Sequence, residues 1–489
     1  MKRVVLLLIA MWCVQTGNAE VVLDLDSCRA LALKNNKGLQ MARGKVEAAA
    51  YLKKAAFTNY LPELSAKGAY LHNQRNLSLL DGDKYLPIMN SAGSIDATVI
   101  NNKWTNLLGR PVPLDADGVP FNPATNPEKI QWKNYAYLPK ESFDVDMRNL
   151  YVGIVTLTQP LYMGGKIAAY NKIAGYAKDL AVTQEETGRQ ELLLETDEAY
   201  WQVVSLTNKQ KLANGYVDLL RKLDSDVQLM IGEGVATAAD GLSVRVKLNE
   251  AEMTLGKVED GVSLSRMALC QLCGLPLETP VRLADEELAA IVLTAQEGRT
   301  ADLSRALEMR PELRSLSLAA KIFKQKERVA LAEHLPNVAL MANYLTSNPS
   351  AYNGIEQKFG GQFNIGVVVS VPLFHFGEGS YQRKAARIET RNAELQLQEA
   401  REKVGLQISQ AVFKYNEAFK NLRRAEKNLE KADENLRFAN LGFEEGVIAP
   451  SGVLEAHTAW LSAHAGQIDA QIEVRLCEVY LNKAVGMMN

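Results

Sequence analysis

The sequence predicts an exported α+β protein in which one structural unit occurs twice and short strands lead directly into very long helices. Three observations support this fold class. The chain begins with a secretory signal pattern, the apolar runs at residues 151–167 and 363–379 share one order of residue types, and a long stretch without proline follows each run. The duplication therefore sets the architecture.

The first residues have the composition of a secretory signal peptide. Lys2 and Arg3 form a short basic start, an apolar segment follows, and small residues close it. We expect residues 1–19 to be removed, because the apolar run is shorter than the roughly 20 residues of a membrane-spanning helix. The remaining 470 residues carry 53 basic and 57 acidic side chains. This balance argues against nucleic-acid binding, and no later stretch is apolar enough to predict a helical membrane protein.

The duplication becomes visible when residues 151–242 are shifted by 212 positions onto residues 363–454, without a gap. The matched positions are those that bend or end regular structure: Pro160 with Pro372, Gly165 with Gly377, and the Glu-Gly-Val triplet 233–235 with the triplet 445–447. In both copies 73 residues separate the proline from the triplet. This constant interval predicts two equivalent strand-to-helix junctions and two equivalent turns.

A second correspondence, in which a Leu-Pro pair recurs at an offset of 274, places a helix before the first strand of each copy. We therefore divide the chain into the signal peptide, a first repeat at 20–300 and a second repeat at 301–489. The first repeat holds a helix, strands near 64–72 and 151–160 around a long external loop at 73–150, and a helix pair with its tip turn near 233–240. The second repeat holds a helix, strands near 338–345 and 363–372, and a helix pair with its tip turn near 445–452.

The strands alternate between apolar residues and small or polar ones, with the period of two that a β-strand requires. Their length of about 9–11 residues matches a tilted strand that crosses a bilayer, although a half-buried sheet in a soluble domain explains the alternation equally well. In a membrane, four strands are too few to close a barrel, and open edges are not tolerated in lipid. Copies of the chain would then share one barrel, and three copies would supply twelve strands.

The long segments predict coiled-coil helices. No proline interrupts residues 161–275 or 373–449. In the second segment, apolar residues recur at alternating spacings of four and three, which is a heptad seam. The seam consists of Val404, Ile408, Ala411, Tyr415, Ala418, Leu422, Ala425, Leu429, Ala432, Leu436, Ala439 and Phe443. A helix of this extent would be on the order of 100 Å long.

The duplication, the strand-Pro-Leu-aromatic-Gly junctions and the two Glu-Gly-Val turns together resemble the TolC-type outer membrane efflux protein family over essentially the whole mature chain. The resemblance implies an α+β membrane protein. A trimeric twelve-stranded β-barrel, with four strands per protomer, would continue into a long α-helical coiled-coil tunnel. It implies a channel-tunnel in the outer membrane of a Gram-negative bacterium that extends into the periplasm and exports small molecules (drugs, toxic compounds) as the exit duct of a tripartite efflux system. The implied partners are two further copies of the chain, a periplasmic adaptor (membrane fusion) protein, an inner membrane transporter of the RND or ABC type, and outer membrane lipid.

Two alternatives to small-molecule efflux stay open. The first is the outer membrane component of a type I protein secretion system, and the second is a periplasmic coiled-coil adaptor or spacer protein. A spacer would not require strands of bilayer length or the same junction twice. An enzyme ranks lower, because the sequence holds no HExxH pair, P-loop or GxSxG motif. Cys270 and Cys273 form a CxxC motif without a second ligand pair, so we expect a structural role and no metal or cofactor.

The resemblance also assigns candidate functional residues. Gly234, Val235, Gly446 and Val447 form the periplasmic tip turns where an adaptor would dock. Pro160, Gly165, Pro372 and Gly377 are the strand-to-helix junctions.

Acidic residues after the tip turns form the expected periplasmic constriction. Three Glu455 side chains near a threefold axis would attract cations, and Asp240 is the corresponding acid of the first repeat. Asp240 has an alternative role as a helix cap. Gly452 replaces an acid that family members often carry, and Ile448 stands where many carry a basic residue.

Overall fold

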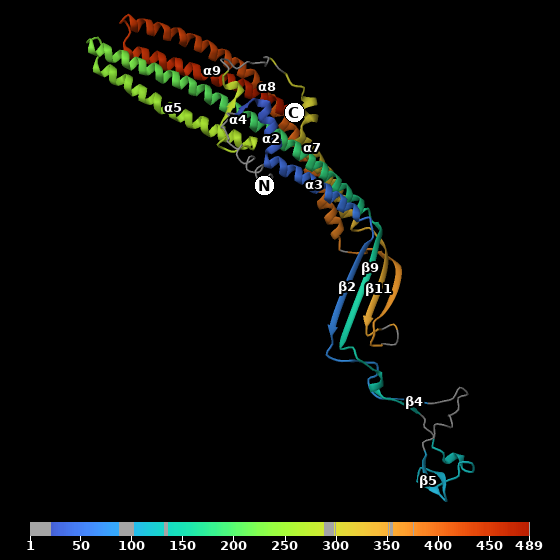
Figure 1. Ribbon diagram of the computed structural model, residues 1–489. Helices are drawn as coiled ribbons and strands as arrows, with labels where there is room; N and C mark the ends of the chain where they lie inside the picture. The colour runs from blue at the N-terminus through green and yellow to red at the C-terminus, as the bar shows by residue number, and fades with distance from the viewer. Residues whose placement is uncertain are drawn as a thin grey trace, which may run out of the picture. The chain divides into compact units, whose positions relative to one another are not determined.

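The computed structural model describes residues 21–87, 102–131, 135–287, 298, 300–350, 352, 356–374 and 376–488 (Figure 1). The predicted signal peptide lies outside the described residues, as do parts of the predicted loop 73–150. The chain divides into a helical unit within Met1–Thr58, Gly164–Leu335 and Pro372–Asn489 and a strand unit within Asn59–Met163 and Pro336–Val371. The units do not coincide with the two sequence repeats, because each repeat contributes strands to one unit and helices to the other.

The strand unit contains a four-stranded antiparallel sheet in the order β12-β11-β9-β2 (Figure 1). Its strands are β2 (Glu63–His72), β9 (Asn149–Met163), β11 (Asn337–Asn348) and β12 (Gly360–Ser370). The two strands of the second repeat, β12 and β11, lie together, and β11 pairs with β9 of the first repeat. Among the described residues, no further strand pairs with the outer edge of β2 or of β12.

The two faces of this sheet differ in polarity. Residues that lie opposite each other on neighbouring strands share a face. One such row is apolar and runs Phe363, Tyr344, Val155, Ala66, and the adjacent row is polar and runs Asn364, Asn343, Thr156, Ser65. Phe363 and Ile365 are each 63% exposed on the apolar face. An apolar face opposite a polar one is the pattern of a membrane barrel strand, with lipid on one side and the lumen on the other.

Short strand pairs occupy part of the segment that the sequence predicted as a loop. They are β3 (Leu77–Ser78) with β8 (Asp144–Val145), β4 (Lys84–Pro87) with β7 (Tyr135–Leu138), and β5 (Lys103–Leu107) with β6 (Arg110–Leu114). Pro87 lies in β4, and Pro111 and Pro113 lie in β6. Proline is tolerated there because each strand of a two-stranded pair is an edge and need not donate every amide.

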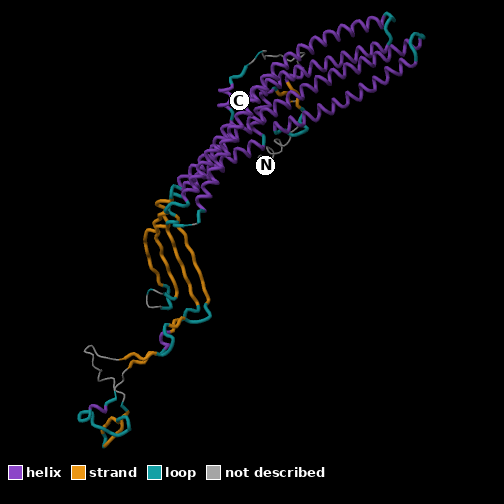
Figure 2. Tube along the Cα trace, turned by 180° about the vertical axis from the view of Figure 1, so that it is seen from behind, coloured by secondary structure: helices purple, strands orange, loops and turns teal. Residues whose placement is uncertain are grey.

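The helical unit is built around two helices of 67 residues, α4 and α8, which confirm the predicted long helices (Figure 2). Its helices are α2 (Leu25–Asn35), α3 (Lys37–Thr58), α4 (Lys166–Gly232), α5 (Ala238–Cys273), α6 (Leu303–Met309), α7 (Pro311–Ala332), α8 (Glu378–Glu444) and α9 (Pro450–Ala484). The helix pairs α4–α5 and α8–α9 form two hairpins that lie side by side, with α4 against α9. None of the described helices contains an apolar window long enough to cross a membrane.

The heptad seam of α8 forms much of the core between α8 and α9. Ile408, Tyr415 and Ala418 are buried there and pack with Val474 and Leu481 of α9. Further along the seam, towards the tip, most residues are only partly buried, and Ala439 is the exception. The sequence period therefore identified which face of α8 meets its neighbour, as expected for a coiled coil.

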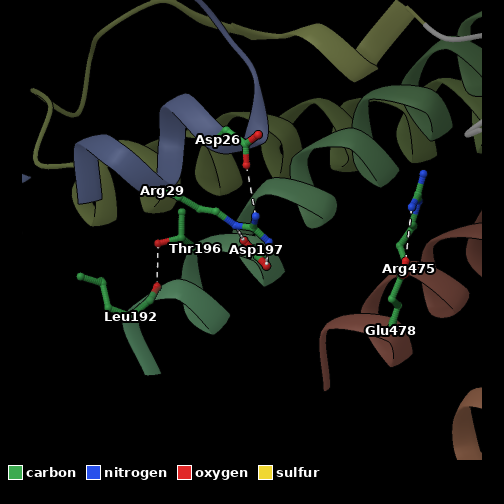
Figure 3. Close-up of polar contacts among 7 residues, drawn as sticks. All are labelled: Asp26, Arg29, Leu192, Thr196, Asp197, Arg475 and Glu478. Atoms are coloured by element: carbon green, nitrogen blue, oxygen red, sulfur yellow. Dashed lines mark hydrogen bonds and ion pairs between the residues drawn. The ribbon is translucent and has the colours of Figure 1, made fainter. Parts of the chain in front are cut away.

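The N-terminal segment is fastened to the middle of the helical unit. The strand β1 (Val21–Leu23) pairs in parallel with β10 (Val281–Leu283). The Arg29 guanidinium of α2 then donates two hydrogen bonds to the Asp197 carboxylate of α4, over 2.7 and 2.6 Å (Figure 3). Asp197 is fully buried, and burial raises its pKa although the Arg29 charge opposes this. Loss of either partner would leave a buried charge without compensation.

Candidate functional site: the hairpin tips and the strand-to-helix junctions

The first tip turn is closed by backbone hydrogen bonds after the last turn of α4. Gly234 takes a φ of 77°, in the left-handed region that favours glycine. The Val235 amide donates to the carbonyl of Met230 over 2.9 Å, and the Gly234 amide donates to that of Ile231 over 3.1 Å. This is a Schellman motif, which satisfies carbonyls that the helix end would otherwise leave free.

The second tip turn repeats this geometry after α8. Gly446 takes a φ of 75°, and the Val447 amide donates to the carbonyl of Gly442 over 2.7 Å. The valine that follows the glycine usually packs back on its own helix in this motif. Here Val235 is 69% and Val447 is 81% exposed. Each tip therefore presents an apolar side chain that the hairpin itself does not cover.

Asp240 caps the start of α5. The Asp240 amide donates to the Thr237 hydroxyl oxygen over 3.2 Å, and the Thr237 amide donates back to the Asp240 carboxylate over 3.0 Å. The Thr237 hydroxyl also donates to this carboxylate over 2.6 Å. These bonds hold the pKa of Asp240 below its usual value. The structure thus shows the capping role, which is one of the two roles that the sequence left open for this residue.

The second hairpin begins its return helix differently. Pro450 occupies the first position of α9, where its fixed φ suits a helix, and Ala449 before it provides no side-chain cap. The side chain of Ile448 fills the space beside Gly442 and Gly452. A Cβ added at Gly442 would lie 2.6 Å from Ile448 Cδ1, and one added at Gly452 would lie 2.9 Å from Ile448 Cγ2. Apolar packing therefore occupies the position where the resemblance suggested a basic residue.

Glu455 lies on the exposed face of α9, within two turns of the tip. It forms no hydrogen bond or ion pair with any residue that the structure describes. A free carboxylate in this position can contribute charge to a surface or a pore lining.

A groove of about 580 Å³ lies between the two hairpins at the tip. It is lined by residues of α4, α8 and α9, among them Lys222, Asp226, Glu444, Glu445 and Val453. The exposed Val235 lies at one side and the second tip turn at the other.

His457 also lines this groove and is only 2% exposed. Its Nδ1 has no hydrogen-bond partner, and burial lowers its pKa to about 4. The sequence gave no signal that the ring of His457 is buried and that its Nδ1 lacks a partner among the described residues.

The junction residues lie where a strand ends or a helix begins. Pro160 pairs with Ala339 next to a register shift in the β9–β11 ladder, which is where proline can enter an inner strand. Pro372 follows β12, which ends at Ser370. Gly165 and Gly377 precede α4 and α8 with φ of 84° and 86°. The two junctions therefore begin their helices with the same left-handed glycine.

No cluster of three or more histidine, cysteine, aspartate or glutamate side chains in the described part of the chain is arranged to hold a metal ion. The four cysteines at positions 28, 270, 273 and 477 are buried.

Comparison with known proteins identifies the family. The family described as outer membrane efflux protein matches residues 136–275 and 303–487. A comparison with curated protein sequences finds no match. Among solved structures, the transmembrane channel protein CusC shares 13% identity at a TM-score of 0.69, over 96% of this chain and 94% of CusC. The outer membrane protein VceC of Vibrio cholerae shares 15% identity at 0.69, over 94% of this chain and 96% of VceC. The outer membrane channel CmeC of Campylobacter jejuni shares 15% identity at 0.68, over 94% of this chain and 85% of CmeC.

These structural matches show the fold along almost the whole chain, and the family match spans both repeats. The long helices and the strand sheet agree with this assignment. The chain therefore belongs to the outer membrane efflux protein family, the non-enzymatic efflux channels of the Gram-negative outer membrane that extend into the periplasm.

Proposed function

We propose that three copies of this chain form one channel-tunnel that serves as the exit duct for small molecules such as drugs and toxic compounds. The observation that carries the proposal is the four-stranded sheet, whose edge strands β2 and β12 lack outer partners among the described residues. Four strands are too few to close, and open edges are unstable in lipid. Three sheets joined edge to edge supply twelve strands and leave no edge open.

The two outer helices of the hairpin pair support the same assembly. Within the helical unit α5 packs mainly on α4, and α8 packs mainly on α9 and α7. Each outer helix carries large apolar side chains that are more than half exposed. They include Leu242, Val246, Met253 and Leu264 on α5 and Tyr381, Ile388 and Leu395 on α8. Stripes of this kind mark a protein interface, and neighbouring copies would cover them.

Reconstitution of the purified full-length protein tests the assembly. We expect native mass spectrometry in detergent to give the mass of three chains, and planar lipid bilayers to show discrete conductance steps. A protein that stays monomeric and opens no ion path would contradict the proposal.

The constriction of this tunnel is proposed to lie at Glu455, with Asp240 as a second acidic residue. Glu455 supports this role because it is exposed and unpaired near the tip, whereas the carboxylate of Asp240 is engaged with Thr237. Three carboxylates close to one axis attract cations and repel anions.

Conductance measurements on matched variants test this constriction. Glu455→Gln should reduce the cation selectivity of the channel severalfold. Glu473→Gln is the matched control, because Glu473 is exposed on the same helix five full turns away and therefore points in the same direction. Equal effects of the two substitutions would assign the selectivity to the general charge of the lumen and remove Glu455 from the constriction.

A periplasmic adaptor (membrane fusion) protein is proposed to dock at the tips and to link the tunnel to an inner membrane transporter of the RND or ABC type. The turns at Gly234, Val235, Gly446 and Val447 support this, because each exposes a valine beside the groove between the hairpins. A charged residue in place of either valine would oppose an apolar contact. In cells whose own channel is deleted, V235D and V447D should slow ethidium efflux while bilayer conductance stays normal. Normal efflux in both variants would remove the valines from the adaptor contact.

A further inference from the structure

Three of the four cysteines outside the signal region gather in one buried core cluster. Cys28 of α2 and Cys273 at the end of α5 are fully buried, and Cys270 is 1% exposed. Cys477 belongs to a different cluster, between α8 and α9. Residues 245 positions apart in the chain therefore bring their thiols into one apolar environment.

Two polar contacts and one close backbone approach hold Cys28 and Cys273 beside each other. The Cys273 thiol lies 3.7 Å from the carbonyl oxygen of Cys28, and the Asn35 amide at the end of α2 donates to the carbonyl of Cys273 over 3.1 Å. Gly274 ends α5 with a φ of 68°, and a Cβ there would lie 2.5 Å from Cβ of Asn35. The parallel pair of β1 and β10 holds the same two chain segments together on the other side.

The thiols of Cys28 and Cys273 also interact directly. The hydrogen bond to Cys273 and burial together raise the pKa of the Cys28 thiol. The Cys270 thiol is directed elsewhere, because it lies 3.9 Å from the carbonyl oxygen of Thr279, and burial raises its pKa.

We propose that Cys28 and Cys273 form a disulfide bond when the exported chain folds in the periplasm. The periplasm is an oxidising compartment, and its thiol-disulfide oxidoreductases supply the oxidant. Before α2 packs, one of the two thiolates attacks the oxidoreductase disulfide and forms a mixed disulfide, and one oxidoreductase sulfur leaves as a thiolate. The other cysteine thiolate then attacks the protein sulfur of this mixed disulfide, which releases the second oxidoreductase thiolate. Two protein thiols lose two electrons and two protons, and the oxidoreductase disulfide becomes a dithiol.

The bond would fasten the N-terminal helix to the end of the first hairpin. It closes a loop that contains both strands of the first repeat and the whole of α4, so it restricts the unfolded chain strongly.

Thiol counting on protein purified from the outer membrane without reductant tests the proposal. After denaturation, N-ethylmaleimide should label only Cys270 and Cys477, and all four cysteines should become labelled after reduction. A tryptic digest should contain residues 20–29 linked to residues 267–282 at a mass about 2 Da below the sum of the free peptides. Because the second peptide holds both Cys270 and Cys273, the C270S variant should keep the link. Four labelled thiols before reduction, or loss of the link in C270S, would overturn the proposal.

Thermal unfolding provides an independent measurement. Reductant should lower the melting temperature of the wild-type protein by several degrees, and it should have no effect on C28S or C273S. The matched control C477S, which removes a buried cysteine outside the cluster, should keep the full response. A wild-type melting temperature that does not change with reductant would contradict the bond even if the variants failed to fold.

Discussion

The two hairpin tips share one backbone turn but place their large side chains on opposite sides of it. At the offset of 212 that relates the repeats, Met230 corresponds to Gly442 and Ala236 corresponds to Ile448. In the first tip the large residue is on the helix and the small one follows the turn. In the second tip the helix residue is glycine, and Ile448 packs into the space it leaves.

The helices that follow the two turns also begin differently. A reciprocal capping box of Thr237 and Asp240 begins α5, while Pro450 begins α9 without a side-chain cap. The duplicated backbone has therefore kept its Schellman turn, and the two tips stabilise it by different means. The first tip uses polar bonds that involve a carboxylate, and the second uses apolar volume. The tips should consequently respond differently to pH and to small changes in side-chain size.

The largest expected difference concerns His457, whose counterpart in the first hairpin is Arg245, an exposed residue paired with Asp224 over 3.3 Å. The pKa of His457 is about 4 in the folded protein, against an ordinary value of 6.5. The unfolded chain therefore binds more protons between these values, and folding stability falls as the pH falls through this window. We expect the second tip to lose on the order of 2 kcal/mol between pH 7 and pH 5.

Hydrogen exchange of tip peptides, corrected for intrinsic rates, measures this loss. The wild-type peptide that contains His457 should lose protection between pH 7 and pH 5, and the H457L variant should lose much less. The peptide around Arg245 serves as the internal control and should change little. An H457L variant with the same pH response as the wild-type protein would show that another group is responsible.

An effect of comparable size is expected from a single methyl group at Gly442. Alanine in place of a helical glycine normally stabilises a helix by about 0.5–1 kcal/mol. Here the added Cβ would lie 2.6 Å from Ile448 Cδ1, so we expect G442A to destabilise the second tip by about 1–3 kcal/mol. The double variant G442A/I448A removes the clash and should recover most of this loss in the same exchange measurement. If G442A alone stabilised the tip, the packing of Ile448 against Gly442 would not control its conformation.

The smallest effect is expected from the polar cap. T237A should weaken the start of α5 by about 1 kcal/mol at neutral pH, because two bonds of the capping box are lost. The pKa of Asp240 is lowered in the folded protein, so its contribution is present above the ordinary value of 3.8 and is lost as the pH falls through the folded pKa. Hydrogen exchange at neutral pH should therefore be faster at the start of α5 in T237A than in the wild-type protein. In the second tip, A449T would test whether a cap can be added there, and a gain below about 1 kcal/mol is expected.

The sequence predicted the elements whose signal is periodic. The heptad spacing of α8 identified buried residues such as Tyr415 and Ala418, and the period-two alternation identified the strands of the sheet. The repeat interval placed both Schellman turns, since a left-handed turn after a helix favours glycine at one position. These features depend on short-range geometry, so the order of residue types is enough to predict them.

Features that depend on distant contacts gave no such signal. Arg29 and Asp197 are separated by 168 positions, and the sequence did not predict their ion pair. The burial of His457 depends on the packing of α9 against α4 and α8, which periodicity alone does not resolve. The short strand pairs near residues 77–145 are only two to five residues long, and their prolines indicated a loop.

The bare flanks of the four-stranded sheet have a consequence for biogenesis. A chain that has just crossed the inner membrane displays two rows of unsatisfied amides and carbonyls, which are templates for aggregation. Whether the unassembled chain escapes aggregation in the periplasm then depends on how quickly it binds further copies of itself or a chaperone. The yield of assembled channel should rise more steeply than linearly with the expression level until the chaperones are saturated. Above that level, aggregated protein should accumulate.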